Sequence, residues 1–317
     1  MAHNSGEPDR RREEFSQDMG RLILQAVSRL RDTDLDNIGV DDAFVVEMLG
    51  IKLSKEIGKG KNGCAVYSGQ IYDSTEVAVK RFVKGHIEVD SHIINFLSIN
   101  PHPNVVCPVS GVKYNRYFGY IIQELCHFSL LDLIDALNPL CNFVVNPDDA
   151  QPMIDYKEKQ KALRDTMRTR GIELWAHKAV GYPSDTVLKL MRDITSGLHY
   201  LHMHDMVHGN LRAENILIVD KNGVLSAKIS DAGIAAVSGR ATAPELYNAG
   251  QRPTTKSDMF CYASIIFFCL TGHHPFGDSI VRDKRTKKNK KDMTLLQRNY
   301  EASILLGDLL STDPNLR

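Results

Sequence analysis

The chain has 317 residues, of which 43% are hydrophobic and 25% are charged, a composition typical of a globular protein and too apolar for wholesale disorder. Lys and Arg together number 39, as do Asp and Glu, so no global field favours a nucleic acid or an anionic membrane, and any such contact must be local. The length exceeds one average domain of about 150 residues, so two domains or one large bilobal domain is expected.

The spacing of the cysteines favours a reducing compartment, and the hydropathy pattern indicates no membrane helix. None of the six cysteines forms a C-x-x-C pair, so neither a zinc ribbon nor a dense disulfide framework is suggested. The amino terminus mixes acidic and basic residues, unlike a secretory signal, and the longest apolar stretch, near Ala263–Leu270, is shorter than the ~20 residues of a membrane helix. We therefore expect a soluble cytoplasmic or nuclear protein with no membrane span.

The first part of the chain is predicted to change from a helical to a β pattern. Residues 1–50 form a polar and amphipathic extension, because apolar residues recur at helical spacing from Phe15 to Leu30. Short β-type runs separated by glycines then begin. The elements expected next are strands over Cys64–Tyr67 and Glu76–Phe82, a helix over Glu88–Leu97 and a strand over Tyr117–Leu125.

From Ser129 onward most periodic segments are helical. The clearest helix begins after Ser184, a suitable N-cap, and places an apolar stripe from Val187 to Leu201 on one face. Residues 138–182 have a charged middle and exceed a normal loop, so we interpret them as an insertion. The basic run 282–291 has the composition of a nuclear address or an RNA contact, but a solvated loop is the commoner role of such a run, so it gives no clear nucleic-acid site.

A glycine motif near the start of the β region is a candidate nucleotide-binding site. Gly58, Gly60 and Gly63 match G-x-G-x-x-G, a pattern that is weak alone because nearby glycines often only mark turns. A dinucleotide-binding version would open a helix. Here a strand follows, and a second strand ends in Val-Ala-Val-Lys at Lys80, which is the arrangement of the glycine-rich hairpin and phosphate-binding lysine of a protein kinase.

Three further blocks follow in the order found in kinases. They are Val207-His208-Gly209-Asn210-Leu211-Arg212-Ala213-Glu214-Asn215, Ser230-Asp231-Ala232-Gly233 and Ala243-Pro244-Glu245. Ordered matches of this kind predict an α+β, bilobal protein-kinase-like fold. We expect a small antiparallel β N-lobe over residues 51–125 and a mainly helical C-lobe over residues 126–317.

The resemblance narrows to one kinase family through segments outside those blocks. These are Leu174-Trp175, Gly181-Tyr182-Pro183-Ser184, Leu188-Lys189-Leu190-Met191-Arg192-Asp193-Ile194 and His274-Pro275-Phe276-Gly277-Asp278. They resemble the kinase domain of the inositol-requiring-enzyme family, the kinase/endoribonucleases of the unfolded protein response, and plant members above all. The likeness covers about residues 50–317 and stops where the family continues into its ribonuclease domain.

This resemblance implies a bound ATP or ADP with Mg²⁺. Lys80 would hold the α- and β-phosphates, and Asp231 and Asn215 would each bind a magnesium ion. The adenine would lie between Ala65 and Ala78 on one side and Leu217 on the other, and the backbone of Glu124 and Cys126 would supply hinge hydrogen bonds beside the polar gatekeeper Gln123. Gly58, Gly60 and Gly63 would lie over the phosphates. Asp258 would brace the catalytic loop, and Glu245 and Arg317 would form a buried ion pair.

Several departures from the family pattern predict weak phosphotransfer. Asn210 replaces the aspartate that accepts the substrate proton, and an amide has no useful basicity near neutral pH. His92 stands where a helix glutamate would pair with Lys80, although Glu88, four residues earlier on the expected helix, could substitute through a register shift. Gly209 removes the arginine that binds an activation-loop phosphate, and Ala232 removes an aromatic anchor.

We therefore expect a pseudokinase-type regulatory module that binds Mg²⁺ and ATP or ADP. Two other hypotheses stay open: a slow but active Ser/Thr kinase, and a nucleotide-independent interaction module. Because the family signals through kinase-domain dimers, the resemblance also implies a homodimer or a heterodimer with related kinase/endoribonucleases.

Overall fold

The structure is a computed structural model that describes residues 51–59, 64–71, 75–114, 118–146, 148–175, 182–236, 243–248 and 250–317. The predicted extension over residues 1–50 and the glycines Gly60 and Gly63 lie outside these described residues. The chain divides into two compact units. The first holds the described parts of residues 1–102, 106–125 and 233–238, and the second holds residues 103–105 and the described parts of 126–232 and 239–317.

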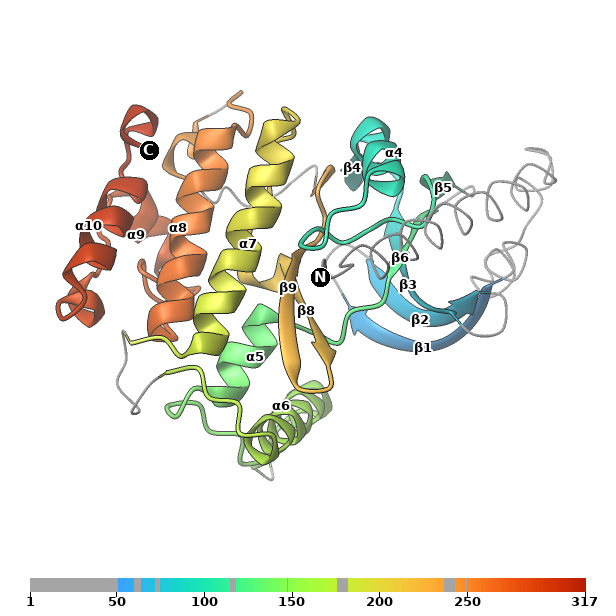
Figure 1. Ribbon diagram of the computed structural model, residues 1–317, viewed down its shortest axis with the longest axis horizontal. Helices are drawn as coiled ribbons and strands as arrows, with labels where there is room; N and C mark the ends of the chain where they lie inside the picture. Colours follow the sequence, from blue (N-terminus) through green and yellow to red (C-terminus); the bar gives the residue numbers. More distant parts are fainter. Residues whose placement is uncertain are drawn as a thin grey trace, which may run out of the picture. The chain divides into compact units, whose positions relative to one another are not determined.

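A five-stranded antiparallel sheet forms the body of the first unit (Figure 1). Its strands, in spatial order, are β1 (Ile51–Lys59), β2 (Ala65–Ile71), β3 (Thr75–Val83), β6 (Phe118–Glu124) and β5 (Lys113–Tyr114). The β-branched and aromatic residues of β3 and β6 suit central strands whose side chains are buried on both faces. These strands confirm the β pattern predicted from the sequence.

The two faces of this sheet are separate apolar surfaces. One face gathers the buried residues Ile51, Ile71, Val77, Val79, Tyr120 and Ile122. The other gathers Phe82, Ile94, Ile121 and Ile234. Since side chains alternate along a strand, Val79 and Lys80 of β3 point to opposite faces, and this alternation decides which residues share a surface with Lys80.

The helix expected over Glu88–Leu97 is wrong at its start. Ile87–Val89 form strand β4, which pairs antiparallel with β10 (Ile234–Ala236). The side chain of Asp90 then accepts hydrogen bonds from the backbone N–H of His92 at 2.9 Å and of Ile93 at 3.3 Å, so it caps helix α4 (Ser91–Ile99). The N-cap therefore separates Glu88 from the helix.

The second unit is mainly helical and is built around α7 (Asp185–Met203), α8 (Thr255–Thr271) and the hairpin of β8 (Ile216–Lys221) and β9 (Val224–Ile229). The Ser184 hydroxyl accepts from the Val187 N–H, which confirms the predicted cap. Gly197 of α7 lies where a Cβ would come within 2.3 Å of the Asn104 carbonyl oxygen, so glycine permits this close approach. In the described part of the chain, no helix is long and apolar enough to span a bilayer.

The remaining elements of the second unit are short apart from α6. They are β7 (Phe128–Ser129), α5 (Leu130–Leu137), α6 (Gln151–Thr169), α9 (Arg282–Lys287), α10 (Tyr300–Leu309) and the 3-10 turns Ala213–Asn215, Pro244–Tyr247, Thr294–Leu296 and Pro314–Leu316.

Helix α6 lies inside the segment that the sequence suggests to be an insertion, and polar contacts hold it and the chain beside it. Arg164 donates hydrogen bonds to the carbonyl oxygens of Ala136, Asn138 and Cys141. The indole N–H of Trp175 donates to the Cys269 carbonyl at 3.1 Å, so Trp175 ties the segment after α6 to α8.

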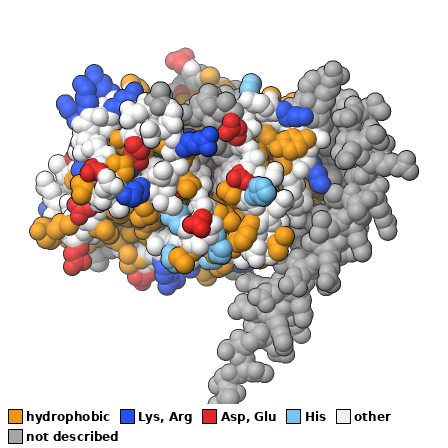
Figure 2. Space-filling model, turned by 90° about the horizontal axis from the view of Figure 1, so that it is seen from above, with side chains coloured by type: hydrophobic (Ala, Val, Ile, Leu, Met, Phe, Trp, Pro, Cys, Tyr) orange, Lys and Arg blue, Asp and Glu red, His pale blue; other side chains and the backbone are white. Residues whose placement is uncertain are grey.

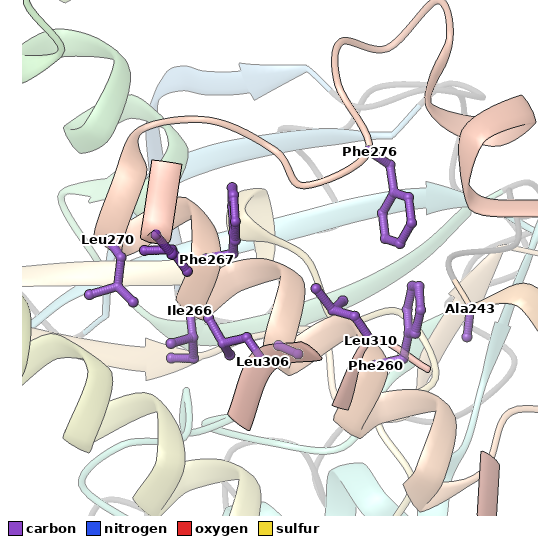
Figure 3. Packing of buried hydrophobic residues seen from close by; sticks show 10 residues of the cluster. Ala243, Phe260, Ile266, Phe267, Leu270, Phe276, Leu306 and Leu310 are labelled. Atoms are coloured by element: carbon purple, nitrogen blue, oxygen red, sulfur yellow. The ribbon is translucent and has the colours of Figure 1, made fainter. Parts of the chain in front are cut away.

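A cluster of buried residues joins α8 to α10 (Figure 3). In it the rings of Phe260 and Phe276 stack with centroids 5.5 Å apart. The guanidinium of Arg317 lies 4.9 Å from the Phe260 ring centre and binds both carboxylate oxygens of Glu245, at 2.7 and 3.0 Å. The Arg317 side chain is fully buried, so the predicted buried ion pair is confirmed.

We predict that Glu245→Gln lowers the free energy of unfolding by about 3 kcal/mol or more, because it leaves the buried guanidinium without its counter-charge. Urea denaturation measures this difference. Lys159→Ala is the matched control, because Lys159 is 56% exposed in its pair with Asp132 and should contribute about 1 kcal/mol or less. Equal effects of the two substitutions would contradict the prediction.

Candidate functional site

The register of β2 and β3 defines the surface around Lys80. Lys80 pairs with Val66 and with Ile121, and Ala78 pairs with Gln123. Directly paired residues of antiparallel strands point to the same face, so Val66, Ala78 and Lys80 share one surface. Gly58 of β1 pairs with Val66 on the other side, which places the first glycine of the motif beside this surface.

The same register corrects the position expected for Ala65. Ala65 pairs with Arg81, and therefore points to the face of the sheet opposite to Lys80 and Ala78. Val66 takes the place beside Ala78 that Ala65 was expected to occupy. The sequence alone did not reveal this, because the glycines before the strand do not fix which of two adjacent residues faces inward.

The segment around Glu124 is fixed by hydrogen bonds to the strand-like chain beside it. The Glu124 N–H donates to the Cys107 carbonyl at 3.1 Å, and the Glu124 carboxylate accepts from the Cys107 N–H at 2.7 Å. The preceding residue, Gln123, is 7% exposed. The side chain of Glu124 thus holds the backbone of this segment in place.

In the second unit, one buried carboxylate organises the loop that carries Asn210. Asp258 is 1% exposed, and its oxygens accept from the backbone N–H of His208 at 2.8 Å and of Gly209 at 2.9 Å. The His202 ring donates to the same carboxylate at 3.0 Å. These bonds confirm that Asp258 braces the loop.

The His208 ring adds a second constraint and reveals its own protonation. Its Nε2 donates to the Ser230 carbonyl at 2.7 Å, because a carbonyl can only accept, and its Nδ1 accepts from the Asn210 N–H. The ring is therefore neutral with its proton on Nε2. Burial lowers the pKa of His208 and outweighs the nearby charge of Asp258, which acts to raise it.

One residue proposed for metal binding, Asn215, is held in place by this loop. The Asn215 side-chain amide nitrogen donates to the Asn210 carbonyl at 2.8 Å, so the amide oxygen, which is the atom that can bind Mg²⁺, is left for a ligand. The Ser230 N–H and hydroxyl both donate to the Asn215 carbonyl. These bonds hold Asn215 beside the backbone of the residue that precedes Asp231.

Two positions here have left-handed backbone conformations. Asp231 has φ +63° and Gly209 has φ +73°, and such a conformation in a non-glycine residue often marks a functional site. A Cβ on Gly209 would lie 3.2 Å from Pro253. Glycine therefore suits this backbone, at the position where the family pattern has arginine.

Leu217 and Cys126 also belong to the second unit. Leu217 is half-buried and alternates along β8 with Ile216 and Ile218, both fully buried, so it points away from the core of this unit. Cys126 is half-buried, and the next residue, His127, donates its N–H to the Ile218 carbonyl at 3.0 Å. This bond ties the chain after Cys126 to the strand that carries Leu217.

The ion pair of Arg212 with Glu214, at 2.5 Å, lies at the end of the same loop and was not predicted from the sequence. Burial acts to raise the pKa of Glu214, but the hydrogen bond and charge of Arg212 outweigh it, and the pKa is lowered. Arg212 and Glu214 carry opposite charges two residues apart in the sequence, and this spacing was the signal that could have predicted the pair.

His92 lies in the first turn of α4 and is exposed, and Glu88 is an exposed residue of β4. The expectation that Glu88 lies on the same helix face as His92 is wrong, because Asp90 ends the strand and starts the helix between them. A helical register shift therefore does not bring Glu88 to the His92 position.

Comparison with known proteins identifies the family. Residues 51–317 match the protein kinase domain, and the chain belongs to this family. The fold also resembles the crystal structure of Rad53 1-466 in complex with AMP-PNP, with a TM-score of 0.60, 22% sequence identity, and coverage of 86% of this chain and 63% of that chain. The predicted two-lobed kinase fold is confirmed.

Within this family the chain is similar to the kinase/endoribonucleases that its motifs indicate. It is 35% identical to IRE1b and 39% identical to IRE1a of Arabidopsis thaliana, over 94% and 83% of this chain. It is 30% identical, over 83% of its length, to the inactive kinase/endoribonuclease IRE1-like of the same plant. The chain spans about a third of the first two relatives and about half of the third, by coverages of 34%, 33% and 49%.

We predict that the protein loses stability between pH 7 and pH 5.5. Burial lowers the pKa of His208 and lowers that of His274 to about 3, whereas unfolded histidine titrates near ~6.5. Below this pH the unfolded chain binds more protons than the folded one, so the free energy of unfolding falls as pH falls, by up to roughly 1.4 kcal/mol per pH unit for each histidine.

Urea denaturation across this pH range measures how steeply the free energy of unfolding depends on pH. The His274 ring accepts a hydrogen bond from the Phe276 N–H at 3.2 Å. His274→Gln keeps an acceptor at this position and should reduce the dependence of stability on pH by about half. Wild-type stability that is constant from pH 7 to pH 5.5, or a variant slope equal to that of the wild type, would show that these rings are not the titrating groups.

Proposed function

We propose that this protein is a kinase-fold module that binds ATP or ADP with Mg²⁺ and transfers phosphate poorly, and that it acts as a regulator. The observation that carries this proposal is Asn210. Its loop is braced by Asp258 and His208 in the manner expected of a catalytic loop, yet the residue at the position of the base is an amide.

The residues for holding a nucleotide support the binding half of the proposal. In the first unit, Lys80 shares a surface with Ala78 and Val66, so a cation lies beside apolar side chains suited to a purine. In the second unit, the amide of Asn215 is oriented by its bond to Asn210. With nucleotide bound, Asn215 and Asp231 would supply the oxygen ligands that Mg²⁺ prefers.

The substitution at Asn210 limits the chemical step. A positioned general base contributes about 10²–10⁴-fold to a rate, and an amide can orient a substrate hydroxyl without accepting its proton. His92 is exposed in the first turn of α4 and cannot offer the fixed negative charge of a carboxylate to Lys80. We therefore place the protein with the weakly active or inactive members of its family.

The relatives support a regulatory role within the unfolded protein response. One relative is named inactive, whereas others are named kinase/endoribonucleases, so the family includes a member that is named inactive. A homodimer, or a heterodimer with a related kinase/endoribonuclease, in the cytoplasm or nucleus would let a nucleotide-bound module change the assembly of an active partner.

We predict that isothermal titration of Mg·ATP into the wild-type protein shows binding that Lys80→Ala or Asp231→Ala weakens tenfold or more. Removing these groups takes away the phosphate cation and a metal ligand. Lys221→Ala is the matched control, because Lys221 is an exposed lysine of the β8–β9 hairpin and its loss should leave binding unchanged. Absence of wild-type binding at millimolar nucleotide would favour a nucleotide-independent interaction module.

We predict that Asn210→Asp raises the rate of autophosphorylation or peptide phosphorylation by about 10²–10⁴-fold, because it restores a carboxylate base. Radiolabel transfer from ATP measures the rate. Asn210→Ala should not raise it, and adding Asp231→Ala to Asn210→Asp should abolish it. Wild-type turnover of about 1–100 s⁻¹, as in ordinary kinases, would refute impaired phosphotransfer and show an active Ser/Thr kinase.

A further inference from the structure

A concentrated positive charge on helix α9 and on the four residues that follow it has no part in the function proposed above. Between residues 282 and 291 there are seven Lys or Arg residues and one Asp, which gives 7 − 1 = +6, in a chain whose formal net charge is zero. A local field of this size attracts anions even though the whole chain does not.

Helix α9 has one buried side and one exposed side. On the buried side, Thr286 is 2% exposed, the Arg282 side chain donates to the Gly277 carbonyl, and Asp283 accepts from the Tyr247 hydroxyl at 3.1 Å. Lys284, Arg285 and Lys288 are exposed. The fold thus directs these cations to solvent. Lys and Arg side chains gather at the left end of the face shown in Figure 2, the end at which α9 and α10 lie in Figure 1.

Two aliphatic residues precede these cations. Ile280 is 89% exposed and Val281 is 39% exposed, and both backbone N–H groups donate to the Asp278 carboxylate, which fixes the turn that presents them. The Arg285 N–H donates to the Val281 carbonyl, so Val281 and Arg285 are one helical turn apart. Aliphatic and cationic groups therefore lie together on the exposed side.

An open cavity of about 560 Å³ borders the same region, and its lining includes Arg285, Lys290, Asp292, Gln297 and Ser303. Asp292 accepts from the hydroxyl and N–H of Thr294, which lowers its pKa. The cavity therefore offers an anionic group to a ligand as well as cations. Such a mixture suits the headgroup of an anionic phospholipid that also carries an ammonium group better than it suits an unbroken run of phosphates.

We propose that the α9 tip, defined as Ile280, Val281, Lys284, Arg285, Lys288 and Lys290, docks on the surface of a bilayer that contains anionic phospholipid. Clustered Lys and Arg residues are attracted to an anionic leaflet, and an adjacent aliphatic side chain inserts at the headgroup boundary. A nucleic acid would use the cations, whereas Ile280, which is 89% exposed beside them, is best accommodated by the apolar boundary beneath the headgroups of a bilayer. The docking is peripheral and independent of nucleotide binding.

Cosedimentation of the full chain with vesicles tests the proposal. Vesicles of phosphatidylcholine with 30% phosphatidylserine should bind the wild-type protein, and vesicles of phosphatidylcholine alone should not. Lys284→Gln/Lys288→Gln should weaken binding about 25-fold, since each basic residue near the surface contributes roughly fivefold. Ile280→Ser should weaken it about tenfold, and this loss should persist at high salt because it is not electrostatic.

The matched control is Lys221→Gln/Val224→Ser, because these residues pair across the β8–β9 hairpin and Val224 is 59% exposed. It should bind like the wild type, and circular dichroism should show all variants folded. No binding by the wild type, or equal binding by the Ile280→Ser variant, would overturn the proposal. Binding to poly(U) without binding to vesicles would also overturn it and would assign the patch to RNA.

Discussion

The buried carboxylate of Asp258 is the constraint on which the candidate site depends. Two backbone N–H groups and one imidazole bind to its oxygens, so directed hydrogen bonds hold a carboxylate that is almost fully excluded from solvent. They also fix the backbone at Gly209, and through His208 they extend to Ser230, the residue before Asp231.

This construction separates the shape of the loop from the chemistry of the side chain at position 210. The bonds that shape the loop go to backbone atoms of His208, Gly209 and Asn210 and not to the Asn210 side chain. The side chain at this position can therefore change from a carboxylate to an amide without loss of the loop. Structure and proton transfer depend on different atoms of the same residue.

The two proposals place different demands on the chain. The residues proposed for nucleotide binding include Lys80 of the first unit and Asn215 of the second, whereas the residues of the α9 tip all belong to the second unit. Its cations are exposed because Thr286, Asp283 and Arg282 take the buried side of α9. A regulator that binds a nucleotide and docks on a lipid surface would combine both properties in one chain with no net charge.

The sequence by itself determined the kinase family, the two-lobed α+β fold and the ion pair of Glu245 with Arg317, because these rest on ordered motifs and on hydrophobic period. The cap at Ser184 was also predictable, since it is a local signal. Only the tertiary structure decided that Val66 rather than Ala65 lies beside Lys80, because strand register is set by pairing with β1 and β3. It also decided that Glu88 lies in a strand, because β4 forms only when β10, about 150 residues later in the chain, lies next to it.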